Sequence, residues 1–339
     1  MPGSAPDDPK LRSDPMLHRV LEDVARTGSE MEQQRSDALL AKKRLFPLVE
    51  NCDGKNRRLI AYLTGPALGN IDLADAAPIG SMLDAIGTCD NLDLMLNSPG
   101  GSGETAEKIV EMCRDHCRKE FRVIVPNYAK SAGTLISLGA DRVVMGYLSE
   151  LGPIDPQILI AVSGVQQSVS GQSFIQAYEA LQEKVKEATT AGESPVGYLQ
   201  SLNATTMEPG FIEHCRRGVE FSRDIAKKFL PRYQLKAKYK GKKGFGKKKL
   251  EDLAEDVAEN LLSRDARFSH GRLIGAEEAS GEVGLNVEAL DRDDSRWQAY
   301  WELYLRAEVY MQTIPVPPEQ AVSKLFFDRN STLPALGAV

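Results

Sequence analysis

Short apolar runs alternate with amphipathic segments between Arg57 and Gly146. Four runs are continuously apolar, as parallel strands covered on both faces are: 57–65, 92–98, 121–127 and 141–146. Between them, apolar residues recur at helical spacing over 77–87, 103–120 and 132–140. This alternation predicts an α/β fold of stacked βα units around a mostly parallel sheet.

The rest of the chain divides around this core by composition. Residues 1–15 hold four prolines and predict a disordered tail, and 16–50 predict a helical arm. We expect one domain over 51–292, with a final strand near its end and a lysine-rich loop at 236–249. That loop is a solvated segment or a site for a polyanion. Residues 293–339 form a C-terminal extension, whose aromatic stretch lies at an interface or packs on its own core.

Composition narrows the class of protein. The 339 residues are 42% hydrophobic and 27% charged, with a net charge of −6, so nucleic acid is not expected as a partner. No apolar run approaches the roughly 18 residues of a membrane span. The polar N-terminus lacks the apolar segment of a secretory signal, and five cysteines suit a reducing compartment. We therefore expect a cytoplasmic protein.

Cys113, His116 and Cys117 are close enough along one predicted helix to suggest metal ligands. A fourth ligand would have to come from elsewhere, and the chain has no CxxC pair. Buried helical cysteines explain the pattern better. We expect no metal and no cofactor.

A glycine-rich turn, "NSPGGSG", joins the second strand to its helix. Gly101, Gly103 and Ala106 fit the G-x-G-x-x-A pattern of dinucleotide sites, but the next strand ends in Pro126 and Asn127 instead of the expected acidic residue. The alternative is an oxyanion hole, in which backbone amides point at a developing negative charge. That interpretation requires a nucleophile nearby.

Ser131 supplies a candidate nucleophile. It follows an apolar strand and precedes small residues that open an apolar helix, so Ala132 offers a second amide. An ordinary helix-capping serine is the competing interpretation.

The segments "LNSPGGS", "KSAG" and "ADRVVMGYLSELGPIDPQ", in this order, resemble the Clp-protease/crotonase superfamily. The chain is most similar to the serine dehydrogenase proteinase family, relatives of signal peptide peptidase A, over roughly Leu59 to Val287. The resemblance implies a serine peptidase with Ser131 as nucleophile and oxyanion amides from Gly100 or Gly101 and from Ala132.

A serine nucleophile needs a base to take its proton. Clp-type relatives carry a histidine after the "DRVV" strand and an aspartate near the final strand. Here Asp155 stands at the first position and His270 within a residue of the second. We hypothesise an exchanged triad in which His270 is the base and Asp155 orients it, since triads are defined by geometry.

Signal peptide peptidase relatives use a lysine instead, and Lys184 and Lys186 fall in the corresponding interval. A lysine base needs desolvation to lower its pKa, whereas the surrounding sequence is rich in Glu. The three remaining histidines lie in helical patterns: His18, His116 and His214. The base is therefore His270, a lysine, or absent.

The leading interpretation is a cytoplasmic serine peptidase that cleaves peptide or protein substrates through an acyl-enzyme. Relatives form rings, so the resemblance implies a homo-oligomer. No ATPase motif is visible, so unfolding of substrates would need a separate ATPase or adaptor. A crotonase-like enzyme acting on acyl-coenzyme A and a catalytically silent oligomeric adaptor are the alternatives.

Overall fold

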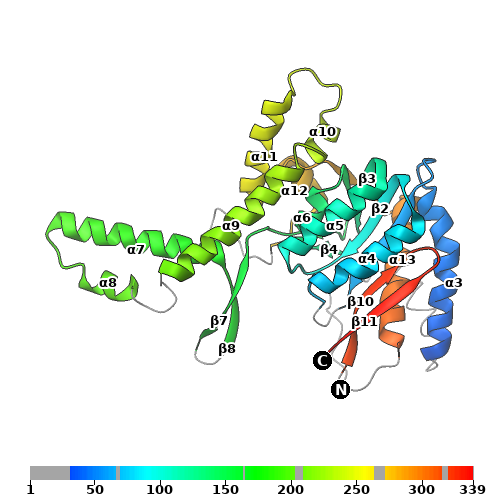
Figure 1. Cartoon of the computed structure of the whole chain (residues 1–339), viewed down its shortest axis with the longest axis horizontal. Coiled ribbons are helices and arrows are strands. Elements are labelled where there is room, and N and C mark those ends of the chain that lie inside the picture. Colours follow the sequence, from blue (N-terminus) through cyan, green and yellow to red (C-terminus); the bar gives the residue numbers. More distant parts are fainter. Residues whose placement is uncertain are drawn as a thin grey trace.

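A seven-stranded sheet forms the centre of the molecule (Figure 1). The structure, a computed structural model, describes residues 31–65, 69–162, 165–202, 209–262, 272–314 and 320–338. The strand order is β11-β10-β1-β2-β3-β5-β9. Five strands are parallel: β1 (Arg58–Thr64), β2 (Cys89–Asn97), β3 (Cys117–Val125), β5 (Arg142–Met145) and β9 (Val287–Ala289). The predicted α/β fold with a mostly parallel sheet is confirmed.

Both faces of the sheet are buried, as the continuous apolar runs predict. One face packs under α3 (Met31–Glu50) and α13 (Ser295–Thr313), where Leu59, Ala61 and Leu63 of β1 point. The other face, which takes Ile60 and Tyr62, packs under α4 (Ala76–Ile86) and α5 (Gly103–His116). Successive strand residues therefore fill two separate cores.

The helix α5 ends at His116, four residues before the end of the predicted segment 103–120. Residues 117–120 continue as β3 because they pair with β2, with Asn91 opposite Glu120. The last four residues of the predicted helix are mostly polar, and their pairing with β2 places them in a strand instead.

An arm projects from the sheet (Figure 1). It contains the hairpin β7 (Gln157–Val162) and β8 (Val165–Ser170), followed by α7 (Gly171–Ala191) and α8 (Val196–Leu202). The long helix α9 (Pro209–Phe229) packs along α7 and returns to the body of the molecule.

The lysine-rich segment 236–249 is more ordered than a solvated loop. It spans the end of α10 (Gln234–Lys238), a turn and the start of α11 (Lys247–Leu261). The rings of Tyr239 and Phe245 stack across the turn with centroids 4.0 Å apart. Short elements complete the described chain: η1 (Leu73–Asp75), β4 (Tyr128–Ala129), α6 (Ala132–Leu138), β6 (Glu150–Leu151) and α12 (Ala276–Gly281).

The C-terminal segment belongs to the central layers. Trp297, Tyr300 and Trp301 of α13 are buried against the sheet, so this aromatic stretch packs on the chain's own core. The strand β10 (Gln320–Phe327) pairs antiparallel with β1, and β11 (Thr332–Ala338) pairs with β10. Across the described ranges, no helix is long and apolar enough to cross a membrane.

Candidate active site

The glycine turn and Ser131 meet because the chain segments that carry them pair as parallel strands. Ser98 bridges to Ala129, and Lys130 N donates to Ser98 O at 2.9 Å. Asn97 Oδ1 accepts from Tyr128 N at 3.0 Å, which fixes the start of the same pairing. Ser131 therefore lies two residues after a strand whose pairing with the "NSPGG" segment is fixed.

Ser131 has a strained backbone. Its φ is 49° and its ψ is −114°. In the ranges that the structure covers, only Asn56 shares a positive φ among residues other than glycine. Such a conformation costs about 1–3 kcal/mol and persists where the surroundings enforce it. In enzymes of the α/β-hydrolase fold, a strained strand-to-helix turn exposes the hydroxyl of the nucleophilic serine.

The side chain of Ser131 does not cap its helix. Ser131 occupies the N-cap position of α6 but makes no side-chain capping hydrogen bond. An ordinary capping serine would accept from an amide in the first turn of the helix. The competing structural interpretation of Ser131 is therefore wrong.

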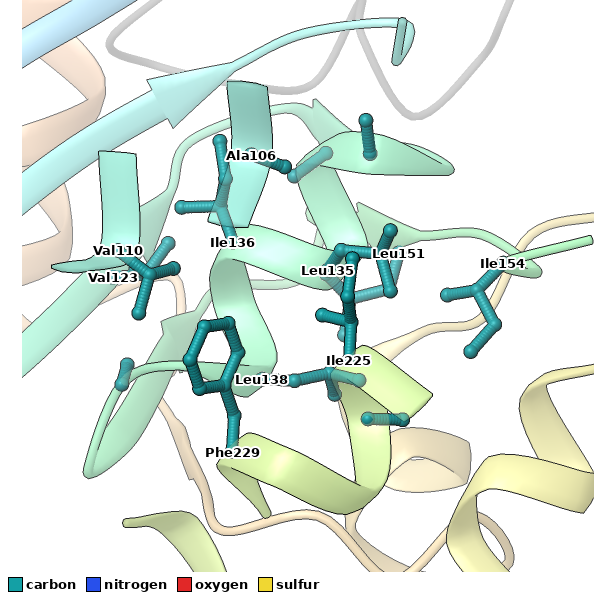
Figure 2. Packing of buried hydrophobic residues seen from close by; sticks show 14 of the residues in the cluster. Ala106, Val110, Val123, Leu135, Ile136, Leu138, Leu151, Ile154, Ile225 and Phe229 are labelled. Atoms are coloured by element: carbon teal, nitrogen blue, oxygen red, sulfur yellow. The ribbon is translucent and has the colours of Figure 1, made fainter. Parts of the chain in front are cut away.

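The helix α6 is buried along its whole length. Figure 2 shows Leu135, Ile136 and Leu138 packed among Val110, Ile225 and other residues of the cluster. Thr134 Oγ1 lies within hydrogen-bond distance of two carbonyl oxygens, those of Ala129 at 2.8 Å and Gly152 at 2.9 Å, and can donate its proton to either one. This packing holds the strained turn at Ser131 in place.

Two backbone amides beside Ser131 have no acceptor in the described part of the chain: those of Gly101 and Ala132. The amide of Gly100 donates instead to Ser98 Oγ at 3.2 Å. Of the two glycines in the predicted oxyanion hole, Gly101 is thus the one whose amide can bind another oxygen.

A pocket of about 590 Å³ opens at Ser131. Its lining includes Gly101 and Ala132, so Ser131 and the residues that carry both amides share one space. Apolar side chains form part of its wall: Leu135, Ile154, Pro156 and Phe221. Such a mixture of apolar walls and a few convergent polar groups is typical of ligand sites.

Asp155 is buried beside this pocket. It has no exposed surface, and its Oδ2 accepts from Gln157 Nε2 at 3.1 Å. Ile154 and Pro156 on either side of it line the pocket. His270, the predicted base, lies outside the described residues.

Lys184 and Lys186 lie on α7, in the projecting arm (Figure 1). Their side chains are 57% and 72% exposed and pair with Glu187 and Glu183 of the same helix. The hydrogen bond with Glu187 raises the pKa of Lys184 above its ordinary value. Neither lysine has the desolvation that a lysine base requires.

Cys113, His116 and Cys117 lie in different surroundings in the structure. Cys113 is fully buried, and burial raises the pKa of its thiol. His116 Nδ1 contacts Met112 O at 2.9 Å, and Cys117 begins β3. Over the described ranges, no group of three or more His, Cys, Asp or Glu could hold a metal.

One supporting segment carries no signal in the sequence. Ile71 bridges to Gly101: its amide donates to Gly100 O at 2.7 Å, and its carbonyl oxygen accepts from Ser102 N at 2.8 Å. A β-carbon on Gly101 would overlap the backbone of Ile71, so this close approach requires glycine. The glycine turn is therefore held on one side by residues 128–130 and on the other by Ile71.

Two relatives come from Methanocaldococcus jannaschii. Uncharacterized protein MJ0137 is 28% identical over 249 residues, which is 74% of this chain and 68% of that protein. Uncharacterized protein MJ1495 is 36% identical over 98 residues, which is 29% of this chain and 30% of that protein. The chain thus spans less than a third of MJ1495.

Two solved structures are similar at low identity. The 1510-N membrane-bound stomatin-specific protease, in a serine-to-alanine mutant form, is 16% identical, with 42% of this chain and 66% of that chain covered and a TM-score of 0.27. ClpP1 from Listeria monocytogenes is 13% identical, with 74% and 99% covered and a TM-score of 0.34. At these scores the similarities say nothing about activity.

The sequence of residues 53–187 matches a family described as ClpP-like SDH-type serine proteinase. This range holds the glycine turn, Ser131 and Asp155. The resemblance seen in the motifs is confirmed. The segments that carry the glycine turn, Ser131 and Asp155 therefore match the ClpP-like SDH-type serine proteinases.

Proposed function

We propose that the protein is a serine peptidase that hydrolyses peptide bonds through an acyl-enzyme on Ser131. The observation that carries this proposal is the arrangement at Ser131. Ser131 has a strained backbone, and its hydroxyl makes no capping hydrogen bond. It lies in a pocket beside two backbone amides that have no acceptor within the described residues. A nucleophile, oxyanion donors and space for a substrate are the parts that acyl transfer needs.

In the proposed reaction, Ser131 Oγ attacks the carbonyl carbon of the peptide bond while its proton passes to a base. The carbonyl oxygen becomes negative and accepts hydrogen bonds from Gly101 N and Ala132 N. The base then protonates the leaving amine, and the C–N bond breaks to leave an ester on Ser131. Water, activated by the same base, hydrolyses this ester.

We propose His270 as the base and Asp155 as the residue that orients it. The burial of Asp155 between two residues that line the pocket supports this assignment. Support also comes from Arg272, two residues after His270 in the sequence. Its carbonyl oxygen accepts a hydrogen bond from Lys130 Nζ, next to the nucleophile, at 3.3 Å.

We further propose that the protein assembles as a homo-oligomer through the arm. Helix α8 exposes Val196, Tyr198 and Leu199, and α7 beside it projects from the body (Figure 1). Apolar side chains gathered on a projecting helix are typical of a contact surface. Sedimentation at micromolar concentration should show an oligomer, and a monomer would contradict the proposal.

Labelling with a fluorophosphonate, followed by peptide mass spectrometry, tests the nucleophile. We expect a single adduct on Ser131, and we expect both the adduct and the hydrolysis of fluorescein-labelled casein to disappear in Ser131→Ala. Turnover of an acyl-coenzyme A by an unlabelled protein would favour a crotonase-like enzyme. Absence of labelling and of both turnovers in a well-folded oligomer would favour a catalytically silent adaptor.

A further inference from the structure

One buried lysine of the hairpin formed by β10 and β11 contacts the segment that packs against the glycine turn. We propose that Lys324, on β10, is a positioning residue that holds the Gly101 amide in place for the reaction. The inference rests on the proposed peptidase function. It adds a residue 193 positions after Ser131 to the apparatus of the site.

Lys324 is buried within a cluster of polar groups. Its residue is 6% exposed, and its Nζ lies 2.8 Å from Asp75 Oδ1 and 2.5 Å from Asp72 Oδ2. Tyr62 OH donates to Asp75 Oδ2 at 2.5 Å from β1. Because an unpaired buried charge is costly, the lysine and Asp75 constrain each other's position strongly.

The two aspartates fix the local backbone. Asp72 N donates to Asp75 Oδ2 at 2.8 Å, and Ala74 N donates to Asp72 Oδ1 at 2.8 Å. Together these bonds form a capping box at the start of η1. Partial burial acts to raise the pKa of Asp72, but its bonds with Lys324 and Ala74 hold that pKa below the ordinary value. Both bonds favour the charged carboxylate, so the box is closed at neutral pH.

Asp72 follows Ile71, the residue that brackets Gly101. The bonds from Ile71 N to Gly100 O and from Ser102 N to Ile71 O enclose Gly101. A contiguous path thus runs from Lys324 through Asp72 and Ile71 to the proposed oxyanion donor. A shift of the 71–75 segment would move the Gly101 amide directly.

The expected effect is on the reaction step. Loss of one oxyanion donor typically lowers kcat by about 100- to 1000-fold, and a misplaced donor should lose part of that. We expect Lys324→Met to lower kcat and the rate of fluorophosphonate labelling of Ser131 by roughly 10- to 100-fold, with KM changed less than about threefold.

Lys42→Met is the matched control. Lys42 Nζ donates to Ser331 O at 2.7 Å and to Thr332 Oγ1 at 2.9 Å, so it ties the same hairpin to α3; within the described part of the chain it makes no hydrogen bond to the 71–75 segment. We expect this variant to label at the wild-type rate within about twofold. Equal losses in both variants would mean a general effect of the hairpin and would overturn the positioning role.

Asp72→Asn gives a milder second test if Lys324→Met does not fold. Its side chain is 56% exposed, so this change should leave folding intact. We expect Asp72→Asn to be labelled roughly 3- to 10-fold more slowly than the wild type. Lys324→Arg, which keeps the charge, should be labelled faster than Lys324→Met and more slowly than the wild type. A wild-type labelling rate in either variant, Asp72→Asn or Lys324→Met, would refute the inference.

Amide hydrogen exchange measures how firmly the 71–75 segment and the glycine turn are held, and it needs no substrate. Peptides that cover 69–75 and 98–104 should exchange faster in Lys324→Met than in Lys42→Met. Unchanged exchange in both peptides would overturn the inference even if activity fell. If the wild type is labelled and Lys324→Met is labelled equally fast, only the positioning role is refuted. If the wild type is not labelled at all, the peptidase proposal itself is refuted.

Discussion

A β-carbon on Gly100 would lie 2.8 Å from Ser131 Cβ and 3.4 Å from Ser131 Oγ. Nothing larger than a hydrogen atom on the Gly100 α-carbon therefore fits between Gly100 and Ser131. The φ of Gly100 is +119°, which side chains of L-residues rarely adopt, so two independent constraints favour glycine at this position.

We expect Gly100→Ala to lower the rate of fluorophosphonate labelling by at least about 100-fold, because the methyl group must displace Ser131 or the turn. It should also cost about 1–3 kcal/mol of unfolding free energy, measured by urea denaturation.

Gly87→Ala is the control for backbone strain alone. Gly87 also has a positive φ, of 65°, but a β-carbon there would meet nothing within 4 Å. This variant should lose about 1 kcal/mol of stability and keep the wild-type labelling rate. A fully active Gly100→Ala protein would show that the close approach is not needed.

The strain at Ser131 predicts an order of stabilities. Glycine tolerates the φ of 49° and alanine does not, so Ser131→Gly should unfold at higher urea concentration than Ser131→Ala. The difference should be about 1 kcal/mol, and both variants should be inactive. The same comparison at Asn56, which also has a φ of 49°, is the control away from the site. Equal stabilities of the two Ser131 variants would indicate a relaxed backbone.

The identity of the base determines which substitutions at positions 155, 184, 186 and 270 should lower kcat. With His270 as base, His270→Ala should lower kcat by a factor comparable to Ser131→Ala, and Asp155→Asn should do less damage. Lys184→Met and Lys186→Met should leave kcat within about twofold. Activity should rise with pH through roughly 6.5, the ordinary histidine pKa.

A lysine base predicts the opposite pattern. Activity would rise at alkaline pH, because a lysine must lose its proton before it can act, and His270→Ala would remain active. A peptide-hydrolysis profile from pH 5 to 10 for the wild type and the four variants separates the two outcomes.

Glu308 predicts a pH dependence of stability. Burial raises the pKa of this carboxyl group to about 7, despite a hydrogen bond with Tyr304 that acts to lower it. Between pH 4.5 and 7 the folded state therefore holds a proton that the unfolded state has released, so stability falls as pH rises through this window. The group's contribution is about 3 kcal/mol.

The difference in unfolding free energy between the wild type and Glu308→Gln isolates this effect from other titrating groups. Relative to the variant, the wild type should lose stability from pH 4.5 to 7 and change little above pH 8. A difference that stays constant over this range would contradict the raised pKa.

The sequence predicted the elements whose patterns are local. The apolar runs of β1, β2, β3 and β5 and the helices between them follow from hydrophobic periodicity within short windows. The glycine turn and Ser131 were recognisable because their residue types are unusual at a strand end. Which glycine amide is able to donate a hydrogen bond to a substrate oxygen was not predictable, since it depends on the Gly100 amide donating to Ser98 Oγ.

Contacts between distant segments were missed for a physical reason. Lys324 looks like any surface lysine in the sequence, and only the pairing of β10 with β1 brings it to Asp75. The aromatic residues of α13 suit an interface and a core equally, so hydrophobicity could not decide between them. Ile71 carries no catalytic residue type, and its role comes entirely from its backbone.

The pairing of β1 with β10 also sets an order of events during synthesis. About 250 residues separate the two strands, so at ordinary translation rates β1 waits tens of seconds for its neighbour. Through that interval its open edge is a template for other chains. Nascent chains of this protein should therefore depend on chaperones while they are being made. Because Lys324 is made 193 residues after Ser131, a half-made chain carries the glycine turn before it carries the lysine that pairs with Asp72 and Asp75.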